Sequence, residues 1–492
     1  MINKRKKTKR KTYRNPKSRL AKSKRTISRK SKSYKSNKSN KSNREHILIN
    51  QLDNLITRDI KGTITNNTIV NSYILNKFIY KQNSSYCICQ IINDMNKGKG
   101  NASVDKNFGN TKKPSICKCK DLRINNTQGR SLANIYKITC NNFVNIIKLF
   151  NIGRPYIRYY METEKYIFLE CDYFSLQSIV HEQINLHSLN DSIKLLSYGL
   201  CKNHNHNDNG KEFISYQLME LADEDTLDIF LTKLLTGMGM HDSNPKESLH
   251  ARDLFINIVL QVFLTYGHLQ TVLEFVHADS KMKNIVVSKC NVNKTKYHTY
   301  NIYGKKIKLS NLGYLVSIID FGRSIISLKS SMQKKQYRLI SPVYFTQHST
   351  HLKRELVEKY ADANIDLLDS KILKDILNYT INPCLVGINI SNILDIYILI
   401  ISLLSIDLIR EYIVKNKLYY ILPKLISADF LQKIIDKLSF TKIHGYADSF
   451  ALFKEVCQEN GNLIESKHAD ININISNLYK KIIDKNDTII II

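Results

Sequence analysis

The first 44 residues contain no Asp or Glu and almost no large apolar side chain, although 20 of them are Lys or Arg. They therefore carry most of the chain's formal charge of +31. A stretch of this composition buries too little apolar surface to offset its ordering entropy, so residues 1–45 are predicted to be a disordered basic tail. Its role is either a solvated linker, an electrostatic arm for nucleic acid, another polyanion or a membrane surface, or a nuclear import signal.

Long apolar runs are missing as well. No apolar segment follows the basic start, which argues against a secretory signal. The longest run, 393–404, is too short to span a bilayer and contains Asp395, so we expect a buried helix and no membrane span. Ten cysteines in such a chain favour reduced thiols and an intracellular location. Tryptophan is absent, and abundant Ile, Asn and Lys are typical of an AT-rich genome.

The cysteines raise the question of zinc. Two Cys-x-Cys pairs occur, Cys87/Cys89 and Cys117/Cys119, and four thiolates could hold the metal. The usual zinc spacing is Cys-x-x-Cys, however, and Cys-x-Cys also arises from ordinary strand alternation. The sequence therefore leaves zinc binding open without favouring it.

Hydrophobic periodicity predicts an α+β chain in which a small β-rich part precedes a larger helical part. The expected strands and helices share one order along the sequence: a hairpin over 132–149, a helix over 174–189, strands at 193–198 and 213–221, helices at 226–236 and 251–276, strands at 285–287 and 315–319, and helices over most of 362–460. Polar motifs fall at the junction of the two parts, where clefts commonly bind ligands.

Two of these motifs carry chemistry. The stretch FVHADSKMKNIVV places Asp279, Lys281 and Asn284 in one short loop, and a later apolar strand ends in Asp320. Phosphoryl transfer needs metal ions on the phosphates, a carboxylate that orients a hydroxyl and accepts its proton, and a cation near the transferred group. Asn284 and Asp320 offer hard oxygen ligands for Mg²⁺, Asp279 offers the base, and Lys281 offers the cation.

The two motifs resemble those of the eukaryotic-type serine/threonine protein kinases. The loop His277-x-Asp279-x-Lys281-x-x-Asn284 is similar to the catalytic loop of that family, and Asp320-Phe321-Gly322 to its metal-binding motif. The resemblance implies a two-lobed fold and use of ATP and Mg²⁺, with Asp279 as base and Asn284 and Asp320 as metal ligands. It also implies that His277 and Phe321 pack to align the site.

The resemblance extends over about 126–455 and assigns further residues. It implies Lys148 as the phosphate-pairing lysine, with Glu182 as its partner and Glu170 as the fallback. It places Gly129 in the phosphate loop, and Met219, Glu220 and Ala222 at the adenine hinge. Asp395 resembles the aspartate that anchors the catalytic loop. The implied segments are an N-terminal extension over 46–125, a small lobe over 126–221, a large lobe over 222–460 and a C-terminal tail over 461–492.

The sequence also departs from the family. Gly129 is the single glycine of the expected phosphate loop, and an extra hairpin is expected over 297–309. Ala278 replaces the arginine that reads a phosphorylated activation segment, so we expect no such switch. No Ala-Pro-Glu motif follows Gly322. These departures resemble the divergent serine/threonine kinases of giant DNA viruses, which implies a place in the host cytoplasm or the virion.

Three functions compete at this stage. The first is an active serine/threonine protein kinase that phosphorylates protein substrates. The second is a pseudokinase that keeps the fold as a binding module, which the sparse phosphate loop favours. The third is a small-molecule kinase of the aminoglycoside or choline type, against which Lys281 counts. A further alternative makes the basic tail the main functional part, with the protein a nucleic-acid or virion component. The sequence does not indicate an oligomeric state.

Overall fold

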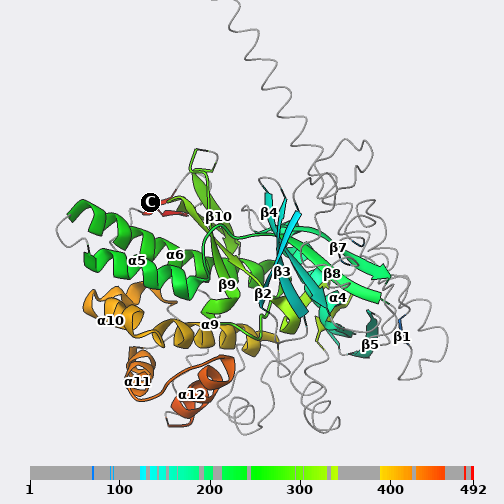
Figure 1. The fold of residues 1–492 in the computed structure, drawn as a ribbon. Helices are drawn as coiled ribbons and strands as arrows, with labels where there is room; N and C mark the ends of the chain where they lie inside the picture. Colours follow the sequence, from blue (N-terminus) through cyan, green and yellow to red (C-terminus); the bar gives the residue numbers. More distant parts are fainter. Residues whose placement is uncertain are drawn as a thin grey trace, which may run out of the picture.

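The computed structural model shows an α+β chain with an antiparallel N-terminal sheet and a mainly helical C-terminal part (Figure 1), as the periodicity predicts. The structure describes residues 69–70, 89, 92, 122–128, 133–140, 143–150, 155–162, 164–187, 193–202, 213–240, 245–293, 295–302, 304–329, 334–341, 388–423, 428–459, 481–483 and 489–491. The basic tail and Gly129 lie outside these residues.

The first sheet has five antiparallel strands in the order β2-β3-β4-β8-β7. Its strands are β2 (Leu122–Gln128), β3 (Ala133–Cys140), β4 (Phe143–Phe150), β7 (Leu195–Lys202) and β8 (Phe213–Glu220). The predicted hairpin is confirmed as β3 and β4, with Ala133 opposite Phe150. Alternating residues of β4 face a small core that includes Ile147 and Leu149.

A second five-stranded sheet was not predicted. It runs β1-β5-β6-β14-β13 and joins distant parts of the chain. Its strands are β1 (Ile69–Val70), β5 (Ile157–Glu162), β6 (Tyr166–Cys171), β13 (Ile326–Lys329) and β14 (Gln336–Ile340). Every residue of β6 is buried, and β14 pairs with it in parallel. The chain that follows Asp320 is therefore built into a sheet with the strand that precedes helix α4.

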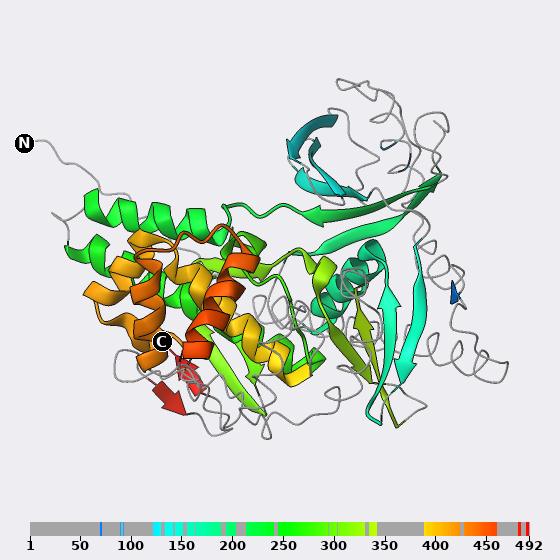
Figure 2. The same ribbon diagram turned by 90° about the horizontal axis from the view of Figure 1, so that it is seen from below.

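Helix α4 (Tyr173–His187) lies between the two five-stranded sheets (Figure 2). Asp172 begins it, since its carboxylate accepts hydrogen bonds from the backbone N–H groups of Phe174 and Ser175. Almost all of its first eleven residues are buried. Its buried residues include the polar side chains of Gln177, His181 and Gln183. Gln177 forms hydrogen bonds with Lys148 and Asp320.

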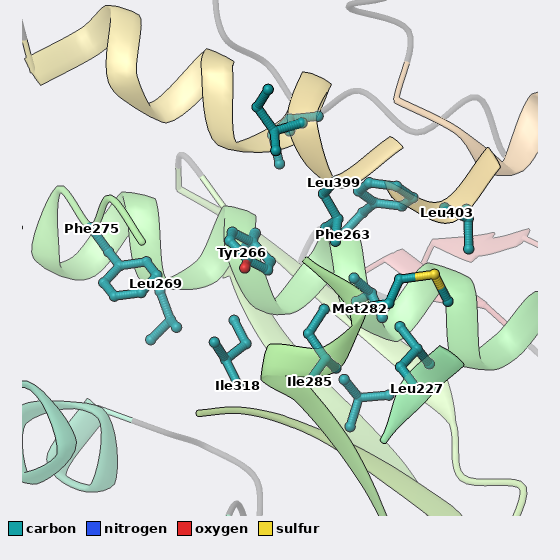
Figure 3. Close-up of a cluster of buried hydrophobic side chains, with 14 of the residues drawn as sticks. Leu227, Phe263, Tyr266, Leu269, Phe275, Met282, Ile285, Ile318, Leu399 and Leu403 are labelled. Carbon is teal, nitrogen blue, oxygen red and sulfur yellow. The ribbon is translucent and has the colours of Figure 1, made fainter. Parts of the chain in front are cut away.

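The helical part is organised around α6 (Pro245–Leu273) and α9 (Ile388–Leu404). The other helices are α5 (Leu227–Met240), α10 (Asp407–Lys415), the 3₁₀ turn η7 (Leu418–Ile421), α11 (Ala428–Leu438) and α12 (Tyr446–Glu459). Phe263 of α6 lies beside Leu399 of α9, and Leu269 lies near Phe275 in the same hydrophobic core (Figure 3). Residues 249–273 are long and apolar enough to cross a membrane, but 83% of the most apolar window is buried, as in a core helix.

Short strands connect the sheets to the helical part. Strands β9 (Ile285–Lys289) and β12 (Tyr314–Ile318) form an antiparallel pair that ends at the two polar motifs. The expected extra hairpin is confirmed as β10 (Tyr297–Ile302) and β11 (Lys305–Ser310). The C-terminal strands β15 (Lys481–Ile483) and β16 (Ile489–Ile491) extend that hairpin, because β16 pairs with β11.

The expectation of reduced thiols is wrong for one pair of cysteines. Cys89 and Cys201 form a disulfide, with their Cα atoms 5.1 Å apart, a separation that permits the bond without backbone movement. Cys171 and Cys290 are free. Of the four cysteines considered as zinc ligands, Cys87, Cys117 and Cys119 lie outside the described residues. The fourth, Cys89, is bonded to Cys201 through its sulfur.

Candidate active site

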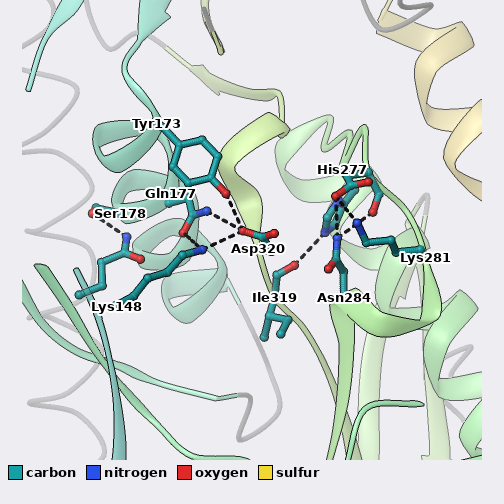
Figure 4. Close-up of polar contacts among 11 residues, drawn as sticks. Lys148, Tyr173, Gln177, Ser178, His277, Lys281, Asn284, Ile319 and Asp320 are labelled. Carbon is teal, nitrogen blue, oxygen red and sulfur yellow. Dashed lines mark hydrogen bonds and ion pairs between the residues drawn. The ribbon is translucent and has the colours of Figure 1, made fainter. Parts of the chain in front are cut away.

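Lys148 lies on β4, and its side chain is 8% exposed. Its ammonium Nζ is 2.8 Å from Asp320 Oδ1 and 3.2 Å from Gln177 Oε1 (Figure 4). The rings of Phe150 and Tyr173 lie 5.5 and 5.4 Å from the same nitrogen. A buried ammonium needs a paired charge and hydrogen bonds to offset the cost of leaving water, and this one has both.

Asp320 follows the end of β12 and has φ 66° and ψ 61°, a left-handed conformation that is uncommon outside glycine. Its Oδ1 accepts three hydrogen bonds of 2.8 Å, from Lys148 Nζ, Tyr173 Oη and Gln177 Nε2. Burial alone would raise the pKa of Asp320, but the Lys148 charge and the hydrogen bonds outweigh it and hold the pKa well below its usual value. The carboxylate is therefore ionised across the working pH range.

The 277–284 loop brings its polar side chains together. Asp279 Oδ2 accepts hydrogen bonds from Lys281 Nζ at 2.8 Å and from Asn284 Nδ2 at 3.0 Å. The same Asn284 nitrogen donates to the Asp279 carbonyl at 2.9 Å. The amide of Asn284 is thereby fixed with its nitrogen toward Asp279, which leaves its oxygen as a candidate ligand for a cation.

Asp395 of α9 holds this loop from beneath, as the resemblance implies. Its carboxylate accepts hydrogen bonds from the backbone N–H groups of His277 and Ala278 and from Ser280 Oγ. Ala278 needs that support because its φ of 59° is left-handed. Burial raises the pKa of Asp395 to about 6, although the charge of His277 and the three hydrogen bonds lower it.

His277 and Phe321 join the two motifs, which confirms their expected packing role. His277 Nε2 lies 2.9 Å from the carbonyl oxygen of Ile319, the residue before Asp320. The rings of His277 and Phe321 are 5.8 Å apart, and His181 of α4 contacts Phe321 at 4.8 Å. Figure 4 shows the Asp320 cluster on one side and the 277–284 loop on the other side of the His277–Ile319 hydrogen bond.

Glycine at position 322 is explained by a close contact with Tyr173. A Cβ built on it would lie 1.7 to 2.4 Å from ring carbons of Tyr173. The aromatic ring thus lies against the backbone of the short 3₁₀ turn η3 (Phe321–Arg323), and glycine is required by this close approach.

The expected ion pair between Lys148 and Glu182 is wrong in this structure. Glu182 Oε2 accepts a hydrogen bond of 2.7 Å from Tyr198 Oη, whereas the helix residue at Lys148 is Gln177. Five helical positions separate Gln177 and Glu182, which is a rotation of about 140°, so the two side chains leave α4 on different faces. The fallback, Glu170, lies on β6 and accepts a hydrogen bond from Tyr156.

Met219 and Glu220 end β8, and Ala222 follows in the connection to α5. The N–H of Glu220 donates to the Lys194 carbonyl at 3.0 Å, so this group is already used between the strands. The connection then runs beside β9, with hydrogen bonds between Glu224 and Val287 and between Val287 and Asp225. These residues therefore lie where the chain leaves the first sheet and passes β9, the strand that follows the 277–284 loop.

Sequence reasoning missed Tyr173 and Gln177. Both side chains lie on one face of α4, four positions apart, and reach Asp320. The signal was faint, because a glutamine among the apolar residues of a predicted helix has no fixed meaning. The resemblance also favoured an acidic partner for Lys148, and Glu182 lies on another face of α4 than Gln177.

A buried ion pair flanks the site. Arg338 of β14 is 0% exposed, and its Nη1 donates to the Glu274 carbonyl at 2.9 Å and to Ser327 Oγ at 2.7 Å. The Glu274 carboxylate lies 3.6 Å from the same nitrogen and accepts hydrogen bonds from Tyr166 and Ser327. This network ties β6, β13 and β14 to Glu274, which follows the end of α6 and lies three positions before His277.

Comparisons with known proteins add little to this geometry. No family model matches the sequence, and no curated protein matches it. The solved structure of WaaP in complex with acyl carrier protein matches 43% of this chain and 66% of that chain, at 10% identity and a TM-score of 0.24. The BubR1 kinase domain matches 49% of this chain and 59% of that chain, at 11% identity and a TM-score of 0.26. TM-scores this low do not establish a common fold.

Proposed function

We propose that this protein transfers the γ-phosphoryl group of Mg²⁺-bound ATP to serine or threonine hydroxyls of protein substrates. One observation carries the proposal. Lys148 with Asp320, and Asp279 with Lys281 and Asn284, form two hydrogen-bonded clusters that adjoin through His277 and Phe321. Together they contain the cation, the base and the oxygen ligands that phosphoryl transfer requires.

The side chains fit a magnesium ion by their chemistry. Mg²⁺ prefers carboxylate, amide and phosphate oxygens and keeps several waters, so one aspartate and one asparagine beside a polyphosphate suffice. All three described donors to Asp320 fall on Oδ1, which leaves Oδ2 for a cation, and Asn284 presents its oxygen. Among the described residues no group of three His, Cys, Asp or Glu side chains is arranged to hold a metal without such a ligand.

Each residue of the candidate active site then has a defined role. Lys148 binds phosphate oxygens, since it already holds an anionic oxygen at 2.8 Å. Asp279 orients the substrate hydroxyl and accepts its proton, and Lys281, 2.8 Å from that carboxylate, places a positive charge next to the transferred group. When bound, the metal ion neutralises charge that develops on the phosphates. Met219 and Glu220 at the end of β8, with Ala222 just after it, hold the adenine, and the proposed phosphate loop includes Gly129.

The protein would then have a place inside a host cell or a virion, with the basic segment 1–44 as an arm for polyanions. The left-handed Asp320 and its three donors support the proposal over a pseudokinase, because a strained residue whose carboxylate is held through one oxygen, with the other left for a ligand, is typical of a functional site.

Labelled ATP tests the proposal. Purified full-length protein is incubated with γ-labelled ATP and Mg²⁺ on a generic basic protein, beside Asp279→Asn and Asp320→Ala. We expect label on serine and threonine of the substrate, abolished by both changes. Nucleotide binding without transfer would support a pseudokinase instead. Transfer to an amino sugar or amino alcohol, with none to protein, would support a small-molecule kinase.

A further inference from the structure

Helix α4 presents two uncharged donors to the proposed metal ligand. Tyr173 and Gln177 lie four positions apart on one face of the helix, and each donates a hydrogen bond of 2.8 Å to Asp320 Oδ1. We propose that Tyr173 and Gln177 are positioning residues that hold Oδ1 of Asp320 and so reserve Oδ2 for the divalent cation. This inference rests on the proposed function and deepens it.

The amide of Gln177 suits this place better than a carboxylate would. Its Oε1 accepts from Lys148 Nζ at 3.2 Å, while its Nε2 donates to Asp320. A glutamate at this position could accept from Lys148 but could not donate to Asp320. It would also add a second negative charge beside a buried site in which Lys148 is the cation that contacts Asp320. The amide therefore bridges the two charges without altering their balance.

Tyr173 is held rigidly enough to position a carboxylate. Asp172 fixes the first turn of α4 through its hydrogen bonds to the backbone of Phe174 and Ser175. The Tyr173 ring lies against Gly322 on one side and is tilted at 5.9 Å from Phe150 on another. Burial, and to a lesser extent the charge of Asp320, raises the pKa of the Tyr173 hydroxyl. The hydroxyl therefore stays protonated and remains a hydrogen-bond donor at every working pH.

The two contacts bind α4 to Asp320 directly. Helix α4 therefore contacts the site through hydrogen bonds to Asp320, the proposed metal ligand. The ion pair of Lys148 is made with Asp320 and not with a residue of α4. Removing either donor leaves Oδ1 with two of its three hydrogen bonds, so Asp320 is held less firmly in its orientation toward the cation. A hydrogen bond to an ionised group is strong enough that we expect the apparent affinity for Mg²⁺ to fall about tenfold for each donor removed.

The experiment compares Tyr173→Phe, Gln177→Glu and the matched control Tyr198→Phe in the full-length protein. Tyr198 also donates its hydroxyl to a carboxylate, at 2.7 Å, but that carboxylate is Glu182 on another face of α4. The first readout is the increase in melting temperature caused by ADP with Mg²⁺ over ADP alone. The second readout is the Mg²⁺ concentration that gives half-maximal phosphoryl transfer.

We expect Tyr173→Phe and Gln177→Glu to reduce the Mg²⁺-dependent increase and to raise the half-maximal Mg²⁺ concentration about tenfold, with little effect in Tyr198→Phe. If all three variants keep the wild-type Mg²⁺ dependence, or if Tyr198→Phe loses as much as Tyr173→Phe, the inference is overturned and the proposed function stands. A wild-type protein whose melting temperature does not respond to Mg²⁺ with ADP would overturn the proposed function as well.

Discussion

Asp395 accepts a hydrogen bond of 2.5 Å from the backbone N–H of His277, which precedes it by 118 residues. Its other oxygen accepts from the N–H of Ala278 at 3.0 Å and from Ser280 Oγ at 2.7 Å. One fully buried carboxylate on a core helix thus fixes the backbone that presents Asp279.

Asp395→Ala should therefore destabilise the protein strongly. The change leaves two buried N–H groups without an acceptor, at a cost of about 1–3 kcal/mol each. We expect the free energy of unfolding, measured with urea, to fall by at least about 2 kcal/mol, together with loss of phosphoryl transfer. A loss of stability smaller than that of an exposed-site change such as Asp407→Ala would contradict the anchoring role.

Asp395 should also make the free energy of unfolding depend on pH. Burial raises its pKa from 3.8 to about 6 in the folded protein. Protonation of the folded state therefore contributes stability that is fully present below the unfolded pKa and is lost as the pH rises through 6. Relative to Asp395→Asn, wild-type stability should decline by about 2–3 kcal/mol between pH 4 and pH 6.5. Parallel profiles for the two proteins would refute this assignment.

Arg338→Met should destabilise the protein by about 3–5 kcal/mol, because it leaves the partly buried Glu274 carboxylate without its closest charge. Arg338 also keeps the pKa of Glu274 below its usual value against the effect of burial. Urea unfolding measures the loss, and Glu274→Gln in the Arg338→Met background should recover part of it. Lys165→Met is the control, since Lys165 is 47% exposed and 3.7 Å from the same carboxylate, so its loss should stay below about 1 kcal/mol.

Gly322→Ala should lower activity through Tyr173. The new methyl group would overlap the Tyr173 ring and force either the ring or the Asp320 segment to move. We expect Gly322→Ala to cause a large loss of phosphoryl transfer in the otherwise wild-type protein. The same change should cause a smaller further loss in the Tyr173→Ala protein, where the ring is absent. Gly304→Ala is a useful comparison, because a Cβ there meets no atom within 4 Å, although its φ of +79° adds local strain. If Gly322→Ala reduces phosphoryl transfer equally in the wild-type and Tyr173→Ala proteins, overlap with the ring is not the cause.

Removal of residues 1–44 should separate catalysis from binding to polyanions. The segment contains 20 basic and no acidic residues. The truncated protein should phosphorylate short peptides at the wild-type rate, but bind a DNA oligonucleotide more weakly and with a smaller dependence on salt. Fluorescence anisotropy at several salt concentrations measures the second effect. A truncated protein that is inactive on peptides would assign the segment a role in catalysis.

Local sequence was sufficient for the parts of the site that are close in the chain. Asp279 and Asn284 are five residues apart, and their hydrogen bonds follow from one short loop before a strand. The β3–β4 hairpin that presents Lys148 was likewise readable from its alternation and its polar turn. The anchoring role of Asp395 came from the family resemblance, while its apolar surroundings indicated only a buried helix.

Long-range geometry could not be predicted in the same way. The sequence cannot tell which face of α4 meets Lys148, so a glutamate appeared more suitable there than Gln177. The pairing of β14 with β6 joins residues such as Leu339 and Leu169, and a parallel register of this kind has no local signal. The close contact that requires glycine at 322 has no local signal either, because the Tyr173 ring comes from another element.

The pairing of β6 with β14 has a mechanical consequence. Strand β6 leads directly into α4, and β14 lies downstream of Asp320, so a shift of either segment must break a parallel ladder along five residue pairs. The strand before α4 is thereby tied to the chain that follows Asp320. Under the proposed function, this ladder would keep α4 docked beside Asp320 without a separate assembly step.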